Sequence, residues 1–164
     1  MSRDAALARQ LLDLRVPVLQ APMFRVSSAR LAAACSRAGM IGAFQLANPD
    51  SLVELEQWLG ALAREEDASR STGQGFAPYC VNVNASPSLR GDYSDRVALC
   101  ERARVPLVLS STGDPTALVP RVHAWGGRLI HDVTTLRFAE KAIAASADGL
   151  MLTCAGAGGH TGAL

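Results

Sequence analysis

Residues 148–162 read DGLMLTCAGAGGHTG. A short apolar run, Leu150 to Leu152, leads into a loop with four glycines and one histidine, His160. Apolar runs of this length bounded by glycine are typical of strands buried on both faces of a parallel sheet. Glycines let backbone N–H groups approach a ligand closely, and a histidine among them can transfer a proton near neutral pH. The stretch therefore predicts a buried strand that ends in a cofactor-dependent active site.

The same alternation of apolar runs and helical patterns extends back to the start of the chain. Strands are expected at 16–20, 41–45, 76–84, 106–110, 128–133 and 150–153. Helices are expected to begin at Ser27 or Ser28, Asn48–Pro49, after residue 91, at Asp114–Pro115 and at Thr134 or Thr135, with a polar loop over 65–75. Pro120 must kink the fourth of these helices or mark its true start. Strict alternation of strand and helix predicts parallel strands with helices packed outside them.

Two architectures fit this alternation, a doubly wound open sheet and part of a (β/α)8 barrel. The first turn after a strand, APMFRVSS at 21–28, lacks the GxGxxG pattern of dinucleotide-binding sheets. Polar residues gather where the strands end, as barrel enzymes require. A complete barrel takes about 250 residues. We therefore predict an α/β fold of the (β/α)8 TIM-barrel type, incomplete, with about six βα units in one domain over residues 1–164.

Composition excludes several classes of function. The net charge is +1 and no basic block is present, which argues against binding to nucleic acid. No apolar run approaches the roughly 18 residues of a membrane span, and no signal core begins the chain, so a cytoplasmic protein is expected. The cysteines at 35, 80, 100 and 154 match no zinc spacing. They predict reduced, buried thiols and no metal site.

Four segments carry a resemblance to a known family: PVLQAPM at 17–23, VNVN at 81–84, FAEKAIAASADGL at 138–150 and AGAGGHTG at 155–162. They resemble segments of the nitronate monooxygenases, also called 2-nitropropane dioxygenases. These are FMN-dependent barrels related to the FMN-dependent enoyl-reductases of fatty-acid synthesis. The resemblance implies FMN as cofactor, a small-molecule substrate, and oxidation of alkyl nitronates or nitroalkanes with O2.

The resemblance also implies roles for individual residues. His160 corresponds to the catalytic base, and the single lysine, Lys141, to a residue that reaches the flavin side chain or its phosphate. The remaining residues placed against FMN are Ala21, Pro22, Met23, Asn82, Gly158 and Gly159.

Other residues compete with these assignments. Asn84 competes with Asn82 for the flavin contact. His131 is the second choice to His160, although a packing role is favoured for it, and Asp132 stays unassigned. A nucleophilic pair of Cys154 with His160 is disfavoured, because strand ends often carry a buried cysteine.

Two departures from the family pattern widen the range of functions. Gly156 stands where many members carry glutamate, so the resemblance does not determine the identity of the substrate. The phosphate-binding loops after strands seven and eight have no counterpart here, so weak or absent FMN retention is expected of these 164 residues alone. The alternatives are an FMN-dependent enoyl-thioester reductase with a nicotinamide donor, and an inactive truncated fragment that needs a partner chain, a second copy or a missing C-terminal half.

Overall fold

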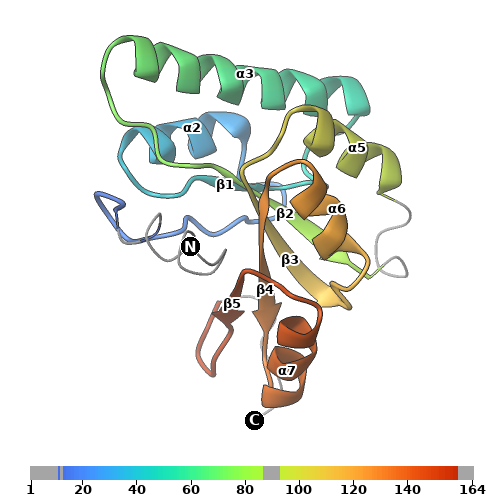
Figure 1. Ribbon diagram of the computed structural model, residues 1–164. Coiled ribbons are helices and arrows are strands. Elements are labelled where there is room, and N and C mark those ends of the chain that lie inside the picture. Colours follow the sequence, from blue (N-terminus) through green and yellow to red (C-terminus); the bar gives the residue numbers. More distant parts are fainter. Residues whose placement is uncertain (1–10, 12, 87–92, 159–164) are drawn as a thin grey trace.

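The computed structural model describes residues 11, 13–86 and 93–158. The elements are α2 (Ala29–Arg37), β1 (Ala43–Gln45), α3 (Leu52–Ser71), β2 (Cys80–Ala85), α5 (Ser94–Arg102), β3 (Leu107–Gly113), α6 (Leu118–Ala124), β4 (Arg128–Val133), α7 (Leu136–Ala144) and β5 (Gly149–Leu152). All neighbouring strands pair in parallel, in the order β1-β2-β3-β4-β5 (Figure 1). This sequential order confirms the predicted alternation and contradicts a doubly wound sheet, in which the order reverses. The fold is that of a partial barrel.

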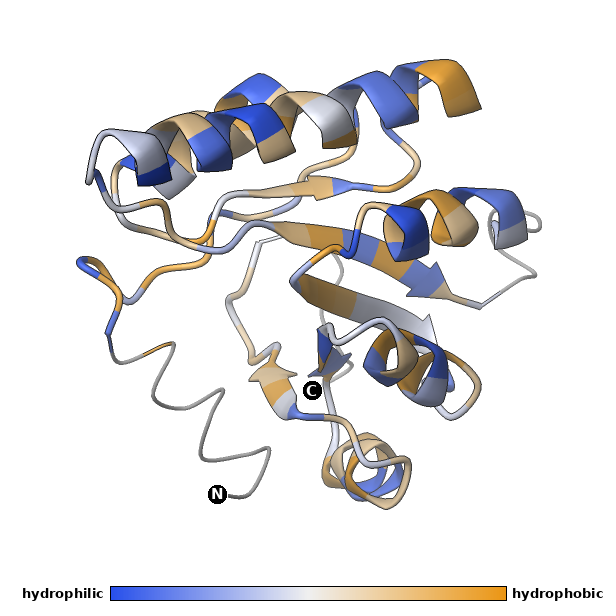
Figure 2. Ribbon diagram, turned by 45° about the horizontal axis from the view of Figure 1, so that its top comes forward, coloured by the Kyte–Doolittle hydropathy of each residue, from blue (hydrophilic) through white to orange (hydrophobic). Residues whose placement is uncertain are grey.

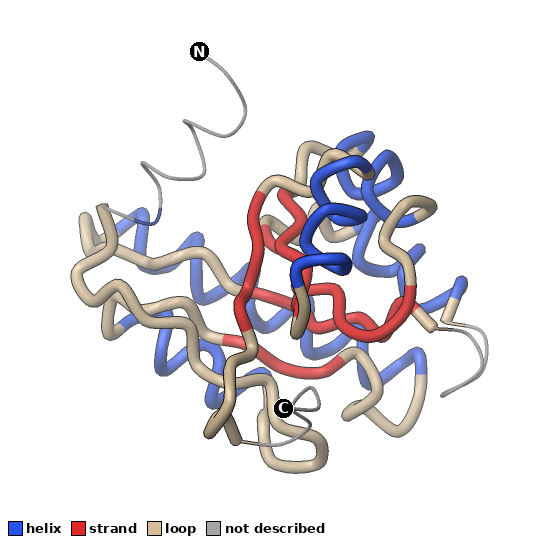
Figure 3. The backbone as a smooth tube through the Cα atoms, turned by 90° about the horizontal axis from the view of Figure 1, so that it is seen from below, coloured by secondary structure: helices blue, strands red, loops and turns tan. Residues whose placement is uncertain are grey.

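Apolar residues fill both faces of the sheet. The larger core lies between the strands and the helices and includes Phe44, Val81 and Leu129. We call this helix-covered side the outer face. The opposite, inner face carries a smaller cluster that includes Cys80 and Ile130 and that packs against residues of the N-terminal segment. Figure 3 shows the strands in red as a curved layer, with the helices in blue outside it.

The first predicted strand, 16–20, forms only an isolated parallel bridge between Leu19 and Ile41. Ile41 donates its N–H to the Val18 carbonyl and accepts one from Gln20. The next backbone hydrogen bond between the two segments is missing, because the side-chain oxygen of Gln20 accepts the Ala43 N–H, at 2.9 Å, in place of a backbone carbonyl. The prediction of a regular strand is therefore wrong, although the segment takes the expected place beside β1.

Side-chain caps begin three of the helices. Ser28 and Thr135 accept backbone N–H groups as N-caps of α2 and α7, which confirms two predicted starts. The predicted start of α3 at Asn48–Pro49 is wrong, because Ser51 caps this helix and accepts the Glu54 N–H at 3.1 Å. Asn48 is free of that role, and its side chain bonds elsewhere.

The start of α6 also differs from the prediction. Asp114 does not open the helix but accepts the Thr116 N–H at 2.8 Å in a turn that precedes it. The helix begins at Leu118, so Pro120 lies in the first turn, where a missing N–H breaks no intrahelical bond.

Helix α3 continues through the region predicted as a polar loop, 65–75, and ends at Ser71. Residues 65–70, EEDASR, include good helix formers, and Arg70 pairs with Glu66 one turn earlier at 2.6 Å. Gly73, two residues after the last residue of the helix, has φ +71° and donates its N–H to Arg70 O. A glycine in this left-handed conformation is a common helix terminator. No helix among the described residues has the length and apolar character needed to cross a membrane.

Replacing Gly42 by alanine is expected to destabilise the protein by at least about 2 kcal/mol, because overpacking a close contact displaces backbone. A Cβ at this position would lie 1.9 Å from the Ala32 carbonyl oxygen, where α2 crosses the sheet next to β1. Chemical denaturation of Gly42→Ala measures the loss. Gly75→Ala is the control, since nothing lies within 4 Å of its Cβ position, and it should stay within about 1 kcal/mol of the wild type. Equal stability of the two variants would contradict the close helix–strand contact.

Candidate functional site

Polar side chains occupy the inner face where the strands end. Side chains alternate between the faces of a strand, so the polar residue two positions after an inner-face apolar residue shares its face. The residues placed in this way are Gln45, Asn82, Ser111, Asp132 and Thr153, which follow Ala43, Cys80, Leu109, Ile130 and Met151. Figure 2 shows β2 passing from orange to blue toward its arrowhead. This carboxyl edge of the strands is where barrel enzymes place their active sites.

Asn82 is the most buried of these polar residues, with 8% of its surface exposed. Its Nδ2 donates to the Leu109 carbonyl oxygen at 2.9 Å and to Ser111 Oγ at 3.2 Å. These bonds hold the amide in a fixed orientation across β2 and β3. The predicted contact of Asn82 with flavin stays a prediction, but the residue lies on the inner face near the expected edge.

Asn84, the competitor of Asn82, shapes the loops that follow β2 and β3. Its Oδ1 accepts the Ser86 N–H at 2.9 Å and the Thr112 hydroxyl at 2.6 Å. Thr112 has φ +51°, a left-handed conformation that is rare for a β-branched residue. The bond from Asn84 helps to hold this strained backbone at the edge of the sheet.

The segment 21–27, which we call the first loop, contains Ala21, Pro22 and Met23. Met23 donates its N–H to Ser27 Oγ at 2.8 Å and to the Ala21 carbonyl at 2.9 Å, and its side chain is 44% exposed. Gln20 Nε2 donates to Ser27 Oγ at 2.9 Å. Sequence reasoning missed Gln20 and Ser27, although a polar residue that ends an apolar strand is a usable signal.

The second half of the expected site is only partly described. Gly158 is exposed after β5, whereas Gly159 and His160 lie outside the described residues. Asp132, unassigned from sequence, accepts a hydrogen bond from the Thr153 hydroxyl. This bond ties the ends of β4 and β5 together just before the glycine loop.

Lys141 lies on α7, in the helix layer on the outer face, and is exposed. The structure therefore does not bring it next to Asn82 on the inner face. The pKa of Asp114, in the loop after β3, is lowered chiefly by hydrogen bonds from Thr116 and to a smaller degree by the positive charge of Lys141. A flavin contact of Lys141 stays a prediction.

His131 packs on the outer face and not in the site. It is 3% exposed, and its Nδ1 lies 2.7 Å from Ser110 Oγ on the neighbouring strand. Burial lowers its pKa, although the charges of Asp132 and Asp114 oppose this shift. The favoured packing role of His131 is confirmed.

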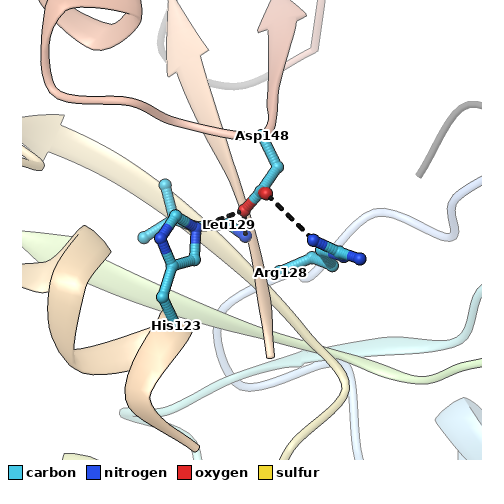
Figure 4. Close-up of polar contacts among 4 residues, drawn as sticks. All are labelled: His123, Arg128, Leu129 and Asp148. Carbon is cyan, nitrogen blue, oxygen red and sulfur yellow. Dashed lines mark hydrogen bonds and ion pairs between the residues drawn. The ribbon is translucent and has the colours of Figure 1, made fainter. Parts of the chain in front are cut away.

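His123 belongs to a polar cluster at the opposite edge of the sheet (Figure 4). Its Nε2 lies 2.8 Å from Asp148 Oδ2, and Asp148 also accepts the Leu129 N–H at 2.8 Å and faces Arg128 Nη1 at 3.5 Å. The carboxylate joins α6 to the starts of β4 and β5. Residues at this amino edge of a barrel contribute to stability more than to chemistry.

The four cysteines differ in their surroundings. Cys80 and Cys100 are buried, and burial raises the pKa of each thiol to about 12, so neither is a thiolate near neutral pH. Their predicted role in packing is confirmed. Cys35 is half-buried, and Cys154 is exposed because it follows the end of β5, so the prediction of a buried thiol at 154 is wrong.

Comparison with known proteins assigns the family. Residues 6–164 match the family model of nitronate monooxygenase. The chain belongs to the nitronate monooxygenase family. This membership agrees with the parallel, sequentially ordered sheet and with the four resembling segments.

This member of the nitronate monooxygenase family is similar to proteins that carry different names. The nitroalkane oxidase of Streptomyces ansochromogenes is 26% identical, has a TM-score of 0.76, and is matched over 93% of this chain and 50% of its own. FabK from Thermotoga maritima is 25% identical with a TM-score of 0.77, over 96% of this chain and 47% of its own. The (3aS,4S,5R,7aS)-5-hydroxy-7a-methyl-1-oxo-octahydro-1H-indene-4-carboxyl-CoA dehydrogenase of Mycobacterium tuberculosis is 27% identical over 93% of this chain and 39% of its own. The chain thus spans half or less of the length of these relatives.

Proposed function

We propose that the chain supplies the first half of the active site of a flavin-dependent oxidoreductase that oxidises alkyl nitronates or nitroalkanes with O2, with FMN as the flavin. The observation that carries this proposal is the fixed amide of Asn82 on the inner face of the sheet, in a member of the nitronate monooxygenase family. The similarity to the nitroalkane oxidase of Streptomyces ansochromogenes supports the substrate class.

The chemistry of the donor set fits a flavin. The isoalloxazine ring presents neutral carbonyl oxygens and ring nitrogens along one edge, which neutral amides, hydroxyls and backbone N–H groups can bond. On the inner face, Asn82 can offer its side-chain oxygen and Ser111 its hydroxyl hydrogen, since the Asn82 Nδ2 donors bond Leu109 O and Ser111 Oγ. In the proposal, Ala21, Pro22 and Met23 lie against the ring, and glycines 158 and 159 let the last loop approach it.

The residues of the chain divide the work in a simple way. When bound, FMN accepts the electrons of the oxidation. His160 removes the acidic proton from the carbon next to the nitro group, which converts a neutral nitroalkane into its nitronate. Asn82 keeps the ring in place through its fixed amide, and Lys141 is proposed to bind the flavin side chain or phosphate.

A purified, flavin-loaded protein that carries this segment is expected to consume O2 with a preformed alkyl nitronate. Visible absorption spectra establish the bound flavin, and an oxygen electrode measures the turnover. The same preparation without flavin is the control. Bound flavin with no oxygen uptake on any nitronate would contradict the proposed substrate class.

A thioester redox enzyme is the second candidate, because the curated Mycobacterium tuberculosis relative is by name a carboxyl-CoA dehydrogenase. For the enoyl-thioester reductase form of this candidate, consumption of NADH or NADPH with an enoyl thioester is the measurement. Steady consumption there, with no oxygen uptake on a nitronate, would favour the reductase.

A further inference from the structure

We propose that Asn48 is a positioning residue for the flavin, which acts by holding the backbone of the first loop, 21–27. This inference rests on the proposed function, in which residues 21–23 lie against the ring. Asn48 itself follows β1 and belongs to a different βα unit from the loop that it holds.

The Asn48 side chain uses both its donor and acceptor groups on the first loop. Its Nδ2 donates to the carbonyl oxygens of Ser27, at 2.7 Å, and Met23, at 3.0 Å. Its Oδ1 accepts the Arg25 N–H at 2.9 Å. A primary amide has two N–H donors and a carbonyl acceptor, so it can make all three bonds at once. A carboxylate of the same size has no donor and would face two carbonyl oxygens.

The loop needs this support because its backbone is strained. Arg25 has φ +60°, a left-handed conformation that costs of order 1 kcal/mol for a residue with a side chain and that persists only where surrounding bonds impose it. The Arg25 N–H is the group that Asn48 Oδ1 binds. The side chain of Asn48 therefore helps to fix the least favourable residue of the loop.

Asn48 is itself held from two sides. Its N–H donates to the Gln45 carbonyl at 2.9 Å. Arg96, on α5, donates from Nη1 to the carbonyl oxygens of Leu46 and Pro49, each at 3.0 Å. The position of the first loop is thus set by β1 and α5, which are packed elements, and not by the loop alone.

The first loop combines a rigid backbone with exposed apolar side chains. Met23 is 44% exposed and Val26 is 63% exposed, and the Arg25 guanidinium lies over the Phe24 ring at 5.4 Å from its centre. Ligand sites are mostly lined by apolar side chains with a few fixed polar groups. The held loop meets this description, and its backbone would lose its preformed shape without Asn48.

The test compares Asn48→Ala with Ser51→Ala in two measurements. The first is amide hydrogen exchange of Arg25 in the flavin-free protein, which is expected to be about tenfold faster in Asn48→Ala, since one such bond has been removed. The second is titration with FMN in the protein that carries this segment, followed by the visible spectrum. We expect about tenfold weaker binding and a changed flavin spectrum.

Ser51→Ala is the matched control, because it lies three residues away and removes the N-cap of α3 without touching the first loop. It should lose stability but keep wild-type exchange at Arg25 and wild-type FMN binding. Asn48→Asp keeps the size and the acceptor but has no donor, so it should bind FMN as weakly as Asn48→Ala. If Asn48→Ala fails to fold, Asn48→Asp takes its place in the FMN titration, and Asn48→Leu, which has no acceptor, takes its place in the exchange measurement, since a carboxylate can still accept the Arg25 N–H.

Each outcome decides the proposal. Fast exchange at Arg25 in Asn48→Ala, with unchanged FMN binding and an unchanged flavin spectrum, would overturn the positioning role and show that Asn48 only stabilises the loop. Unchanged exchange at Arg25 in Asn48→Ala would show that Asn48 does not hold the first loop. An equal loss of FMN affinity in Ser51→Ala would show that the loss is not specific to Asn48, and would also overturn the proposal. A wild-type protein that binds no flavin would contradict the proposed function and the inference together, whereas flavin binding lost only with Asn48 supports both.

Discussion

Replacing His160 by alanine is expected to reduce turnover of a neutral nitroalkane by about a hundred- to ten-thousand-fold, the usual contribution of a general base. The same variant should oxidise the preformed nitronate at close to the wild-type rate, because a nitronate has already lost the proton that His160 removes. Steady-state oxygen uptake with both forms of one substrate, in the flavin-loaded protein, gives the two rates.

The preformed nitronate serves as the internal control, since it uses the same pocket and the same flavin. His160→Gln adds a second comparison, because glutamine can hydrogen-bond a substrate but cannot act as a base near neutral pH. Equal losses on both forms, with flavin still bound, would show that His160 only positions the substrate. Full activity of His160→Ala on both forms would remove His160 from the reaction altogether.

The sheet could be predicted from sequence because its signals are local and repeated. The apolar runs at 106–110 and 128–133 lie close to β3 (Leu107–Gly113) and β4 (Arg128–Val133). The strict alternation of strand and helix then implied the parallel order. Where the prediction failed, the cause lies in competition for hydrogen bonds. The Gln20 side chain accepts the Ala43 N–H, so the first predicted strand lacks a backbone hydrogen bond to β1 at this position.

Element boundaries failed for a related reason. Asn48–Pro49 has the composition of a helix start, yet the Asn48 amide bonds a loop 21 to 25 residues earlier in the chain, and Ser51 takes the cap. Polarity alone predicted a loop after residue 64, whereas helix propensity and the Glu66–Arg70 pair continue α3. Hydrogen bonds between residues a few positions apart can be predicted from a sequence, but hydrogen bonds between different βα units cannot.

The site is predictable to the extent that strand ends mark it. Asn82 lies on β2, inside the strand predicted at 76–84, whereas its partners Leu109 and Ser111 come from the next unit. The first loop was identified by its resemblance to the family, but the residues that hold it were missed. Gln20 lies in the resembling segment 17–23, but Ser27 and Asn48 lie in none of the four segments, and only the folded chain brings the three residues together.

Replacing Asp148 by alanine is expected to lower the free energy of unfolding by about 3–5 kcal/mol, as when one partner of a buried polar pair is removed. The Asp148 side chain is 2% exposed and is bonded by His123 Nε2 and the Leu129 N–H, both at 2.8 Å. Alanine would remove the acceptor of the buried Leu129 N–H and the partner of His123 Nε2. Urea denaturation followed by circular dichroism measures the change in stability.

Two variants show whether the effect belongs to the buried carboxylate. Asp148→Asn keeps an acceptor for the Leu129 N–H but loses the charge, so its loss of stability should be smaller than that of alanine. Glu101→Ala removes an exposed pair with Arg121, at 3.3 Å, and should cost no more than about 1 kcal/mol. If Asp148→Ala were as stable as Glu101→Ala, the link between β4 and β5 at this edge would contribute little. A larger loss of stability in Asp148→Ala than in Glu101→Ala, together with wild-type FMN binding by folded Asp148→Asn, would show that this edge of the sheet stabilises the fold. The flavin is proposed to bind at the opposite edge.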